Sequence, residues 1–496
     1  MNYMSTRGDK ASVSAARAII KGLASDGGLF VPQEIPQVDD DFITSLLYLS
    51  YQERAKKVIS LYLTDFTADE IDKCVENAYG NNKFDTAKIV PTVNLKGNDY
   101  LLELWHGPTS AFKDMALQLL PQFISTSLKK LGDKNDLVIL VATSGDTGKA
   151  ALDGFKDVEQ TKIIVFYPNQ GVSKIQRLQM LTQEGNNVNV VAVNGNFDDA
   201  QSGVKCIFSD SEYNELLAKK GSQLSSANSI NWGRLLPQIV YYFSAYADLV
   251  NEQKIAVGDK VNFTVPTGNF GDILAGFYAK CMGLPVNRLI CASNSNNVLT
   301  DFLSTGIYDK NRHFYKTISP SMDILISSNL ERLLYHITGD CEKVKNWMLS
   351  LQQEGKYSVD EATLNRIKET FACGWLGDED TKKCIKAVYE EDNYVADTHT
   401  AVAIKVAQDY NIKSGETYPM VILSTASPYK FNDSVLEALG ENINGKDEFM
   451  LLDRLAQLNK DAIPYGLDKL KTAKVIHDKV CEKQDMIKAV SEFLAI

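Results

Sequence analysis

The chain has 496 residues, of which 44% are hydrophobic and 23% are charged, so it can bury a large core and form two or three compact units. It carries 52 Lys and Arg against 63 Asp and Glu, and the net charge of −11 argues against nucleic acid or an anionic membrane as a partner. The eight cysteines show neither CxxC spacing nor ligand-like pairing with the five histidines, which predicts reduced thiols and no metal site.

The first part of the chain carries no obvious chemistry. Residues 40–85 have the apolar spacing of helices with charged outer faces. The N-terminal stretch lacks the apolar core of a signal peptide, and no stretch of the sequence is long and apolar enough to span a bilayer. We therefore expect a cytoplasmic protein.

The stretch HGPTSAFKDMA, residues 106–116, places one lysine between a Gly-Pro turn and an apolar run of helical spacing. Asp114 or Ser110 is available to cap this helix. Lys113 is thus expected at a loop-to-helix junction, where the unpaired N–H groups favour the neutral amine. A neutral amine is a nucleophile, although most lysines in such positions are simply exposed.

Short β-rich runs alternate with amphipathic stretches through the middle of the chain. This alternation predicts parallel sheet covered by helices on both faces. Ligands in such folds bind outside the carboxyl ends of the strands, so function is expected in the loops that follow them. The runs are residues 136–143, 161–168, 188–195, 260–268, 287–294 and 418–426.

Two of these loops are rich in glycine and open a helix. Backbone N–H groups of 144–148 and of 267–272 could each cradle a carboxylate or a phosphate. Neither loop is a Walker loop or a GxGxxG motif, which disfavours ATP and dinucleotides. Each loop, taken alone, is equally well explained as a tight turn.

Other polar residues follow strands or begin helices. The hydroxyl of Thr425, at the end of the last strand, could meet a ring nitrogen or simply cap the turn. Asn228, Asn231 and Arg234 concentrate donors near a helix start, and Lys174 begins another helix. Together they offer the local positive pocket that a phosphorylated substrate needs in an acidic protein, although Lys174 alone has the features of an exposed surface lysine.

A lysine, several anion-cradling loops and a hydroxyl for a ring nitrogen favour pyridoxal phosphate (PLP) as cofactor. The sequence also resembles the threonine synthase family, in its longer bacterial and fungal type, over almost the whole chain. The resemblance consists of ten ordered blocks: YMSTRG, GLASDGGLFVP, ELWHGPTSAFKDMA, VATSGDTGKAAL, NGNFDDAQ, NSINWGR, VPTGNFGD, SMDILISSNLERLLY, DTHTAVA and LSTASPYKF.

The resemblance implies an α/β fold of the fold-type II PLP enzymes, like that of the tryptophan synthase β subunit. Two open, parallel-type sheets flanked by helices are expected, with helical extensions at both ends. The implied domains are an N-terminal extension over 1–88, a catalytic core over 89–435 with a smaller mobile lobe around 136–245, and a C-terminal helical segment over 436–496.

The resemblance also implies roles for individual residues. Lys113 bears the PLP and acts as acid and base, and Thr425 faces the ring nitrogen. The cofactor's phosphate is assigned to Gly268, Asn269, Phe270, Gly271 and Asp272. The substrate's α-carboxylate is assigned to Thr143, Ser144, Gly145, Asp146 and Thr147. The substrate's phosphate is assigned to Lys174, Asn228, Asn231 and Arg234.

The implied activity is that of a carbon–oxygen lyase acting on phosphates, at the last step of threonine biosynthesis. It converts O-phospho-L-homoserine and water to L-threonine and phosphate, by γ-elimination followed by β-addition of water. A small-molecule substrate and a monomer are expected. For the two histidines nearest the motifs, we expect His106 to stack near the cofactor and His399 to be a hydrogen-bonded structural residue.

One block departs from the family, which usually reads STAHPAKF where this chain has Ser427 and Tyr429. This change invites one of the two alternatives that stay open, the second below. One is another fold-type II lyase, such as a serine or threonine dehydratase or a phospholyase, and the other is a PLP-binding protein without turnover.

Overall fold

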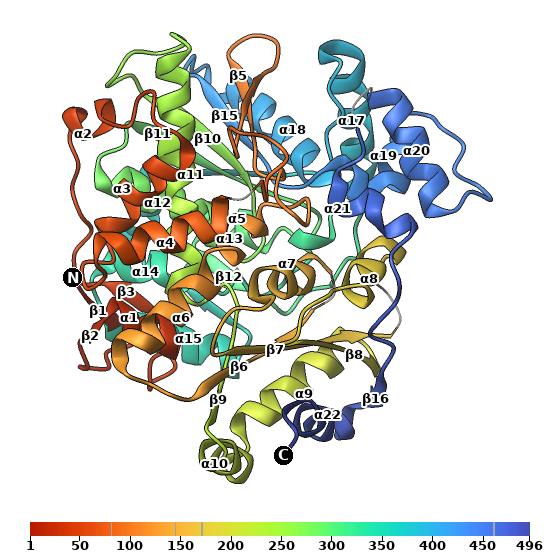
Figure 1. The fold of residues 1–496 in the computed structure, drawn as a ribbon. Coiled ribbons are helices and arrows are strands. Elements are labelled where there is room, and N and C mark those ends of the chain that lie inside the picture. Colours follow the sequence, from red (N-terminus) through yellow and green to blue (C-terminus); the bar gives the residue numbers. More distant parts are fainter. Residues whose placement is uncertain (81, 144, 170–171, 460–461) are drawn as a thin grey trace.

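The fold is described from a computed structural model, for residues 1–80, 82–143, 145–169, 172–459 and 462–496. Two largely parallel sheets dominate it, a six-stranded sheet in the upper half of Figure 1 and a five-stranded sheet in the lower half. Helices surround both sheets and fill the space between them (Figure 1). No helix in these ranges is both long and apolar enough to cross a membrane.

The N-terminal segment forms a small antiparallel sheet followed by short helices. The sheet has the order β2-β1-β3. Both longer helices begin with a capping box, made by Ser50 with Glu53 and by Thr67 with Glu70, which satisfies free N–H groups at the helix start. The elements are β1 (Asn2–Ser5), β2 (Val13–Ser14), α1 (Ala15–Lys21), β3 (Phe30–Pro32), α2 (Asp40–Thr44), α3 (Tyr51–Ser60) and α4 (Ala68–Tyr79).

The larger sheet has the order β14-β11-β10-β15-β5-β4, and all neighbours are parallel except the edge pair β4 and β5. β10 and β15 are buried along their whole length because helices cover both faces. The strands are β4 (Thr92–Asn94), β5 (Asp99–Glu103), β10 (Val261–Pro266), β11 (Val286–Ser293), β14 (Phe371–Trp375) and β15 (Met420–Ser424).

The helices around the larger sheet include α11, which is buried along nearly its whole length and carries Trp232, Tyr241 and Tyr242 into the core. The described helices of this region are α5 (Lys113–Leu117), α6 (Leu120–Leu131), α11 (Trp232–Asn251), α12 (Gly271–Met282), α13 (Val298–Thr305), η1 (Pro320–Met322), α14 (Leu330–Thr338), α15 (Cys341–Gln353), α16 (Glu361–Thr370), α17 (Asp378–Asp392), α18 (Thr398–Ser414), η2 (Pro428–Phe431) and α19 (Asn432–Ala438). A two-stranded ribbon, β12 (Ile307–Asp309) with β13 (Lys356–Ser358), lies among them.

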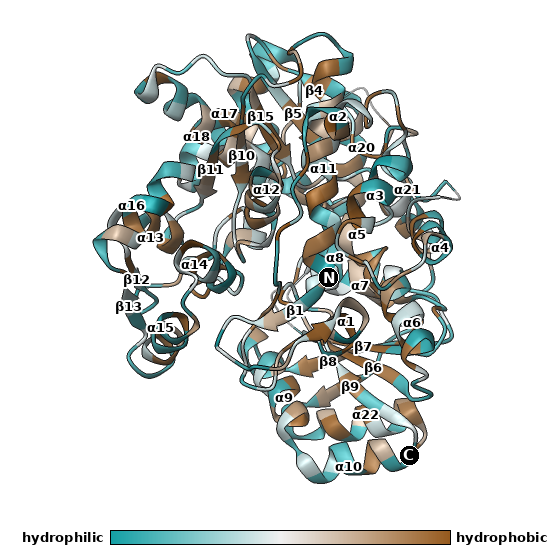
Figure 2. Cartoon of the chain, turned by 90° about the vertical axis from the view of Figure 1, so that its left-hand side faces the viewer, coloured by the Kyte–Doolittle hydropathy of each residue, from teal (hydrophilic) through white to brown (hydrophobic). Residues whose placement is uncertain are grey.

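The second sheet has the order β16-β8-β7-β6-β9 and is wholly parallel. Its strands are β6 (Asp136–Ala142), β7 (Thr161–Pro168), β8 (Val188–Asn194), β9 (Ser222–Ser225) and β16 (Val480–Glu482). Its central strands are strongly hydrophobic in Figure 2. The helices that cover it are α7 (Asp146–Phe155), α8 (Lys174–Leu181), α9 (Phe197–Ser209), α10 (Ser211–Lys219) and α22 (Met486–Leu494).

The C-terminal segment differs from the helical extension that the sequence predicted. It contains α20 (Glu448–Asn459), α21 (Tyr465–Asp468), η3 (Lys469–Lys471) and η4 (Lys483–Asp485), but it also supplies β16 to the edge of the second sheet. The N–H of Ala192 donates to Lys479 O at 2.9 Å where this strand begins. A strand this short carries too little periodicity to be recognised before its partner is known.

The six strands predicted from β-rich runs are confirmed. The helix expected after Lys113 is instead divided into α5 and α6. Pro121 lies in the first turn of α6 and has no N–H to give to the carbonyl of Leu117, four residues earlier. Gly154 of α7 packs against that carbonyl, where a Cβ atom would collide with it, so the break brings α5 and α7 together.

Candidate active site

Three loops meet at one edge of the larger sheet. Lys113 follows β5, residues 267–272 follow β10, and Thr425 follows β15. These three strands are neighbours in the order β10-β15-β5 and run parallel, so their carboxyl ends lie side by side. The edge is therefore a site of the kind that parallel sheets form, and it gathers residues that are far apart in the sequence.

Lys113 is the first residue of α5, and its amine is held among several charged groups. Its Nζ donates to Ser321 Oγ at 3.4 Å and lies 4.9 Å from the ring centroid of Phe112. Burial lowers the pKa of Lys113 to about 8, the positive charges of Lys430 and Arg234 act in the same direction, and Asp146 opposes them. A much larger fraction of this amine is neutral near pH 7 than in an ordinary lysine.

The predicted cap of this helix is wrong. No side chain caps the N-terminus of α5. Asp114 instead accepts from the N–H of Thr109 at 2.8 Å and from its hydroxyl at 2.7 Å, which fixes the turn before Lys113. Burial raises the pKa of Asp114 to about 7. Gly107 leaves room for this carboxyl, since a Cβ there would lie 2.6 Å from the Asp114 side chain.

The Lys113 and Thr425 loops are joined through their backbones. The N–H of Phe112 donates to Thr425 O at 2.8 Å, and the N–H of Ser427 donates to Ser110 O at 3.1 Å. Thr425 is only 5% exposed, so its hydroxyl lies in the interior of the site. These bonds fix the lysine relative to the hydroxyl that the sequence assigned to a ring nitrogen.

The glycine loop after β10 is held by its carbonyls. Ser327 Oγ donates to Gly268 O at 2.9 Å, and the N–H of Asn329 donates to Asn269 O at 3.1 Å. Phe270 has φ +62°, and a Cβ at Gly268 would lie 2.8 Å from Ser321 O. No hydrogen bond among the described residues uses the N–H groups of 268–270, so these donors remain for an anion.

A buried amide faces the same loop. Asn329 is fully buried, and its Oδ1 accepts from Arg332, which leaves its Nδ2 without a partner among the described residues. A Cβ at Gly271 would lie 3.4 Å from this nitrogen. An unpaired buried donor beside a glycine loop is the arrangement that an anion stabilises.

The carboxyl of Asp272 is bonded to α11, so the backbone of this residue is the part available to a phosphate. Its Oδ1 accepts from Tyr241 at 2.5 Å and from Tyr242 at 3.1 Å. Burial raises the pKa of Asp272 to about 7. A carboxyl that is partly protonated near neutral pH repels a nearby anion less than a full carboxylate does.

The second sheet contributes the loop after β6. Thr143 Oγ1 accepts from the N–H groups of Gly145 and Gly148, both at 3.1 Å, and so closes the turn. The side chain of Thr147 is partly exposed. Ser144, which the sequence assigned to the same site, lies outside the residues that the structure describes.

Asp146 joins the two sheets. It lies 2.6 Å from Lys430, which also donates to Thr109 O at 2.8 Å, and it accepts from Gln176 at 2.9 Å. Burial alone would raise the pKa of Asp146, but the charges of Lys430 and Lys113 hold it well below its usual range. The carboxylate of Asp146 is therefore already engaged. If this loop binds the substrate's carboxylate as predicted, it does so through its backbone N–H groups.

The residues assigned to the substrate's phosphate are only partly brought together. Arg234, on the first turn of α11, is 7% exposed; one nitrogen donates to Ala227 O at 2.9 Å and its Nε has no partner among the described residues. Burial lowers the pKa of Arg234 to about 10. A guanidinium this deeply buried with a free N–H is suited to hold an anion.

The other members of that set have different surroundings. Asn231 is fully buried, accepts from the N–H of Gly233 and donates to Ile19 O, both at 2.9 Å, so it caps α11. Asn228 is exposed. Lys174 is about half exposed and pairs with Glu448 of α20 at 2.8 Å. Arg234 is thus the strongest of the four for phosphate binding.

Two histidines have carboxylate partners. His106 stacks on Trp105 with ring centroids 4.2 Å apart and bonds to Asp85 and Glu103. Burial alone would lower the pKa of His106, but the two carboxylates raise it to about 9. His399 lies 2.8 Å from Asp397 and accepts from the N–H of Ser321 at 3.1 Å.

Sequence reasoning missed four residues of this site: Gln176, Ser321, Asn329 and Lys430. Ser321 and Asn329 lie in the block SMDILISSNLERLLY, to which no chemistry was assigned. Lys430 lies in the block LSTASPYKF, in which only Thr425 was given a role. The resemblance to the family indicated that these segments are part of the site. It did not indicate which side chains they contact, because those lie in other parts of the chain.

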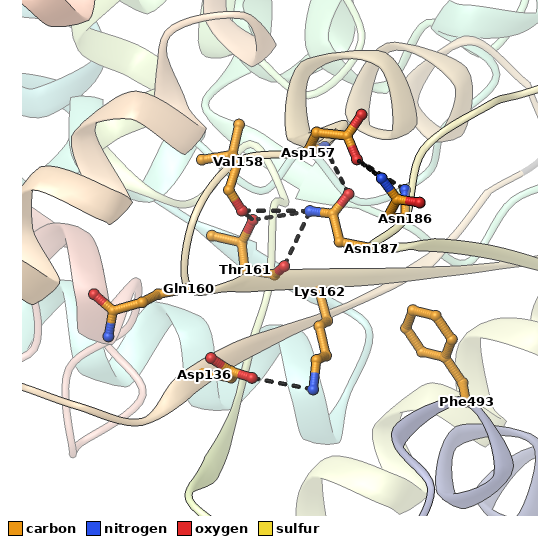
Figure 3. A pocket seen from close by; sticks show the side chains of 9 residues that line it. All are labelled: Asp136, Asp157, Val158, Gln160, Thr161, Lys162, Asn186, Asn187 and Phe493. Atoms are coloured by element: carbon orange, nitrogen blue, oxygen red, sulfur yellow. Dashed lines mark hydrogen bonds and ion pairs between the residues drawn. The ribbon is translucent and has the colours of Figure 1, made fainter.

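A separate hollow of about 470 Å³ lies on the second sheet, away from Lys113 (Figure 3). Its polar side chains are bonded to one another or to the backbone: Asp136 pairs with Lys162 at 3.0 Å, and Asn187 donates to Phe155 O at 2.8 Å. We assign it no function.

Two family models match the ends of the chain, described as "Threonine synthase N terminus" over residues 2–79 and "Threonine synthase, C-terminal" over residues 400–477. Threonine synthase of Pseudomonas aeruginosa is 40% identical over 440 residues, which are 88% of this chain and 90% of that protein. The human protein "Threonine synthase-like 1" is 42% identical over 435 residues, which are 86% of this chain but 58% of that protein.

Two solved structures are similar over essentially the whole chain. PLP-bound threonine synthase from Brucella melitensis superposes with a TM-score of 0.89 at 38% identity and covers 99% of both chains. Threonine synthase from yeast has a TM-score of 0.89 at 36% identity and covers 100% of this chain and 99% of its own.

The two largely parallel sheets, with the partly buried Lys113 at the strand ends of the larger one, have the fold of the fold-type II PLP enzymes, and the expected fold class is confirmed. The chain belongs to the threonine synthase family. It spans 58% of the length of human threonine synthase-like 1, so that protein contains sequence with no counterpart in this chain.

Proposed function

We propose that this chain is a PLP-dependent threonine synthase, which converts O-phospho-L-homoserine and water to L-threonine and phosphate. One observation carries the proposal. The amine of Lys113, with a pKa lowered to about 8, lies where three strand-end loops of the larger sheet meet the loop after β6. Membership in the family and the PLP bound in the relative from Brucella melitensis support the same activity.

The residues present fit PLP. Buried polar atoms without a partner among the described residues occur in the segments that form the site: Ser110 Oγ and Ser427 Oγ in the joined Lys113 and Thr425 loops, Asn329 Nδ2 beside the glycine loop, and Arg234 Nε on α11. Leaving such groups unpaired costs about 1–3 kcal/mol each, so a polar ligand that bonds to them stabilises the site. The glycine loop at 268–271 offers backbone donors of the number and kind that a phosphate accepts.

Each part of the cofactor has residues suited to it. Lys113 Nζ would form the covalent bond, and the N–H groups of 268–272 with Asn329 would hold the phosphate. The hydroxyl of Thr425 would face the ring nitrogen. A neutral hydroxyl would leave that nitrogen largely unprotonated, so the ring would hold less negative charge. This favours elimination over transamination.

PLP, when bound, supplies an aldehyde that combines with the substrate's amine and a ring that accepts electrons from its α-carbon. Lys113 Nζ, freed when the substrate combines, takes the α-proton, and its lowered pKa keeps a useful fraction in the basic form. Arg234 holds the γ-phosphate as its charge develops on leaving. Closing of the lobe that carries the loop after β6 would enclose the reacting groups and limit the access of water to the one molecule that adds at Cβ.

The loop after β6 would bind the substrate's α-carboxylate through its N–H groups, from Thr143 to Thr147, with Ser144 included as predicted from the sequence. Lys174 and Asn228 stay predictions for the substrate's phosphate. Lys174 would have to leave Glu448 to reach it. Asn231 supports this region by capping α11, next to Arg234.

The test follows phosphate and threonine together after mixing the PLP-loaded protein with O-phospho-L-homoserine. Equal release of both supports the synthase. Phosphate with ketobutyrate, and without threonine, replaces the proposal by a lyase. A change in the PLP spectrum without any product leaves only binding.

A phospholyase is the second candidate, favoured by one observation. Ser427 stands where the family usually has histidine, and its buried hydroxyl has no partner among the described residues. Loss of the histidine removes a group from the site, and a site that controls water poorly would release ketobutyrate. Replacing Ser427 by His in the same assay tests this, since a lyase created by the missing histidine should gain threonine formation.

Assembly, location and mobility also remain proposals. We propose a monomer in the cytoplasm, acting on a small-molecule substrate, with residues 1–88 as an extension and a lobe around 136–245 that moves over the core. Sedimentation at several protein concentrations tests the monomer. Hydrogen exchange with and without substrate tests the lobe, which should become protected on binding.

A further inference from the structure

Ser321 lies between the parts of the proposed site, on the short helix η1. Its hydroxyl accepts from Lys113 Nζ at 3.4 Å, although the two residues are 208 positions apart. Its carbonyl oxygen lies against Gly268, where any Cβ would come within 2.8 Å of it. Ser321 thus contacts both the reactive lysine and the glycine loop.

His399 holds the backbone of Ser321 from the other side. The N–H of Ser321 donates to His399 Nε2 at 3.1 Å. Because Nε2 is an acceptor, the ring proton of a neutral His399 sits on Nδ1, which donates to Asp397 Oδ1 at 2.8 Å. Both side chains are almost fully buried, at 2% and 1% exposure.

Asp397 is itself fixed at the N-terminus of α18. It accepts from the N–H groups of His399 at 2.8 Å and Thr400 at 3.3 Å, as a helix cap does. The ring of His399 also packs against Phe431, with centroids 4.8 Å apart. The Ser321 backbone is therefore held on two sides. Its N–H is bonded to His399, which is buried and bonded to Asp397, and its carbonyl oxygen lies against Gly268.

We propose that Ser321 is a catalytic residue of the proposed reaction, whose hydroxyl orients the Lys113 amine, and that Asp397 and His399 are positioning residues that act through it. The inference rests on the proposed function. In a neutral amine, one N–H directed at Ser321 Oγ fixes the direction of the lone pair. When Lys113 takes a proton, the same hydrogen bond becomes charge-assisted and stronger, and the proton stays on the nitrogen.

The first experiment compares Ser321→Ala with Ser321→Thr in the PLP-loaded protein. Loss of the hydroxyl should lower kcat about 10-fold to 100-fold while KM and the PLP dissociation constant change less than about twofold, because orientation of a base acts mainly on proton transfer. The threonine variant keeps a hydroxyl and should recover most of kcat. Ser350→Ala is the matched control: Ser350 lies on α15, and its hydroxyl donates to Lys356 O at the start of β13 rather than to a residue of the site.

The second experiment needs no turnover. Limited acylation of the cofactor-free full chain, followed by peptide mapping at several pH values, gives the pKa of the Lys113 amine. Asp146, Asp114, Lys430 and Arg234 face this amine in every variant, so a change reports the lost hydrogen bond. Removal of an acceptor that stabilises the ammonium form should lower the pKa in Ser321→Ala and leave it unchanged in Ser350→Ala.

His399→Phe keeps a ring against Phe431 but removes the acceptor for the Ser321 N–H. It should lower kcat, by less than Ser321→Ala does, with KM nearly unchanged. If this variant does not fold, the two serine variants decide the question alone.

The outcomes distinguish a failure of the proposed function from a failure of the role proposed for Ser321. If the wild-type protein releases no threonine, the proposed function fails first. If the wild type is active and Ser321→Ala retains both its kcat and the pKa of Lys113, only the role of Ser321 is overturned. A loss of kcat that threonine does not rescue, with unchanged Lys113 pKa, also overturns it, because that pattern indicates a packing defect.

Discussion

The two parallel sheets contribute to the site in different ways. The larger sheet places three strand-end loops side by side, and these loops are bonded to one another through backbone groups of Phe112, Thr425, Ser110 and Ser427. The second sheet contributes the loop after β6, and Asp146 of that loop pairs with Lys430 at 2.6 Å. The larger sheet thus places the lysine, Thr425 and the glycine loop, whereas the second sheet adds one loop to the site, through an ion pair and through a hydrophobic core that residues of both sheets share.

This division agrees with the chemistry proposed. A lysine that exchanges protons needs a fixed position, because misplacement by an ångström is costly. The loop after β6 has a different part in the proposal, since it binds the substrate and belongs to the lobe that we propose moves over the core.

Replacing Lys113 by Ala should lower threonine formation by about 10³-fold or more, because it removes both the covalent anchor and the base. Coupled assays of phosphate and threonine measure the loss. Lys149→Met is the matched control: burial lowers the pKa of Lys149 to about 8 as well, but its amine bonds to Gln183 in the layer of the second sheet. Retained activity in Lys113→Ala would contradict the assignment of the larger sheet as the reactive one.

Replacing Asp146 by Asn should destabilise the protein by about 3–5 kcal/mol, because it leaves the buried charge of Lys430 without its partner. Chemical denaturation measures the free energy of unfolding. The double variant Asp146→Asn with Lys430→Met should recover most of the loss. Asp136→Asn breaks the more exposed pair with Lys162 and should cost less than about 1 kcal/mol; equal costs for both pairs would show that the link between sheets has no special weight.

The contribution of His106 to the stability of the larger sheet's edge should depend on pH. Its pKa is raised from 6.5 to about 9, so its contribution to stability is fully present below pH 6.5 and is lost as the pH rises through 9. The difference in unfolding free energy between the wild type and His106→Gln should therefore shrink across this window, by on the order of 2 kcal/mol. A difference that is independent of pH would show that the two carboxylates do not stabilise the charged ring.

Replacing Gly268 by Ala should weaken PLP binding by about 10-fold, which corresponds to about 1.4 kcal/mol. The added Cβ would lie 2.8 Å from Ser321 O and would push the loop from its position. A spectroscopic titration measures the dissociation constant. Gly377→Ala is the control, because the nearest atom to its Cβ is 3.8 Å away; unchanged binding in Gly268→Ala would mean that the loop does not hold the cofactor.

Much of the fold could be predicted from the sequence, because its signals are local. The β-rich runs predicted the six strands, and the apolar spacing predicted the helices before residue 85. The division of the helix after Lys113 was missed although Pro121 was visible, since a proline in the first turn of a helix is indistinguishable in sequence from one that follows a break. The strand β16 was missed because its three residues pair with β8, almost 300 positions earlier.

The candidate site was predicted in part for the same reason. Thr425 and the glycine loop were predicted because each follows a β-rich run, and parallel strands carry ligand sites at their carboxyl ends. Lys113 was predicted from its place at a loop-to-helix junction and from the family resemblance. Asn231 was given to the substrate, whereas its side chain caps α11. Ser321 and Lys430 were not predicted, because no sequence pattern around a single serine or lysine indicates which distant residues it will contact.

The amino-acid sequence indicated which residues could do chemistry, and for Thr425 and the two glycine loops it also indicated a position after a buried strand. Only the tertiary structure decided which of them meet: the order β10-β15-β5 is not the order along the chain, and it brings Lys113 beside Thr425 and the loop at 268–272. The tertiary structure also placed Asp146 on Lys430 and His399 on Ser321. The physical reason is that hydrophobic periodicity specifies how a segment folds locally, whereas strand order and buried polar contacts depend on packing between segments that are hundreds of residues apart.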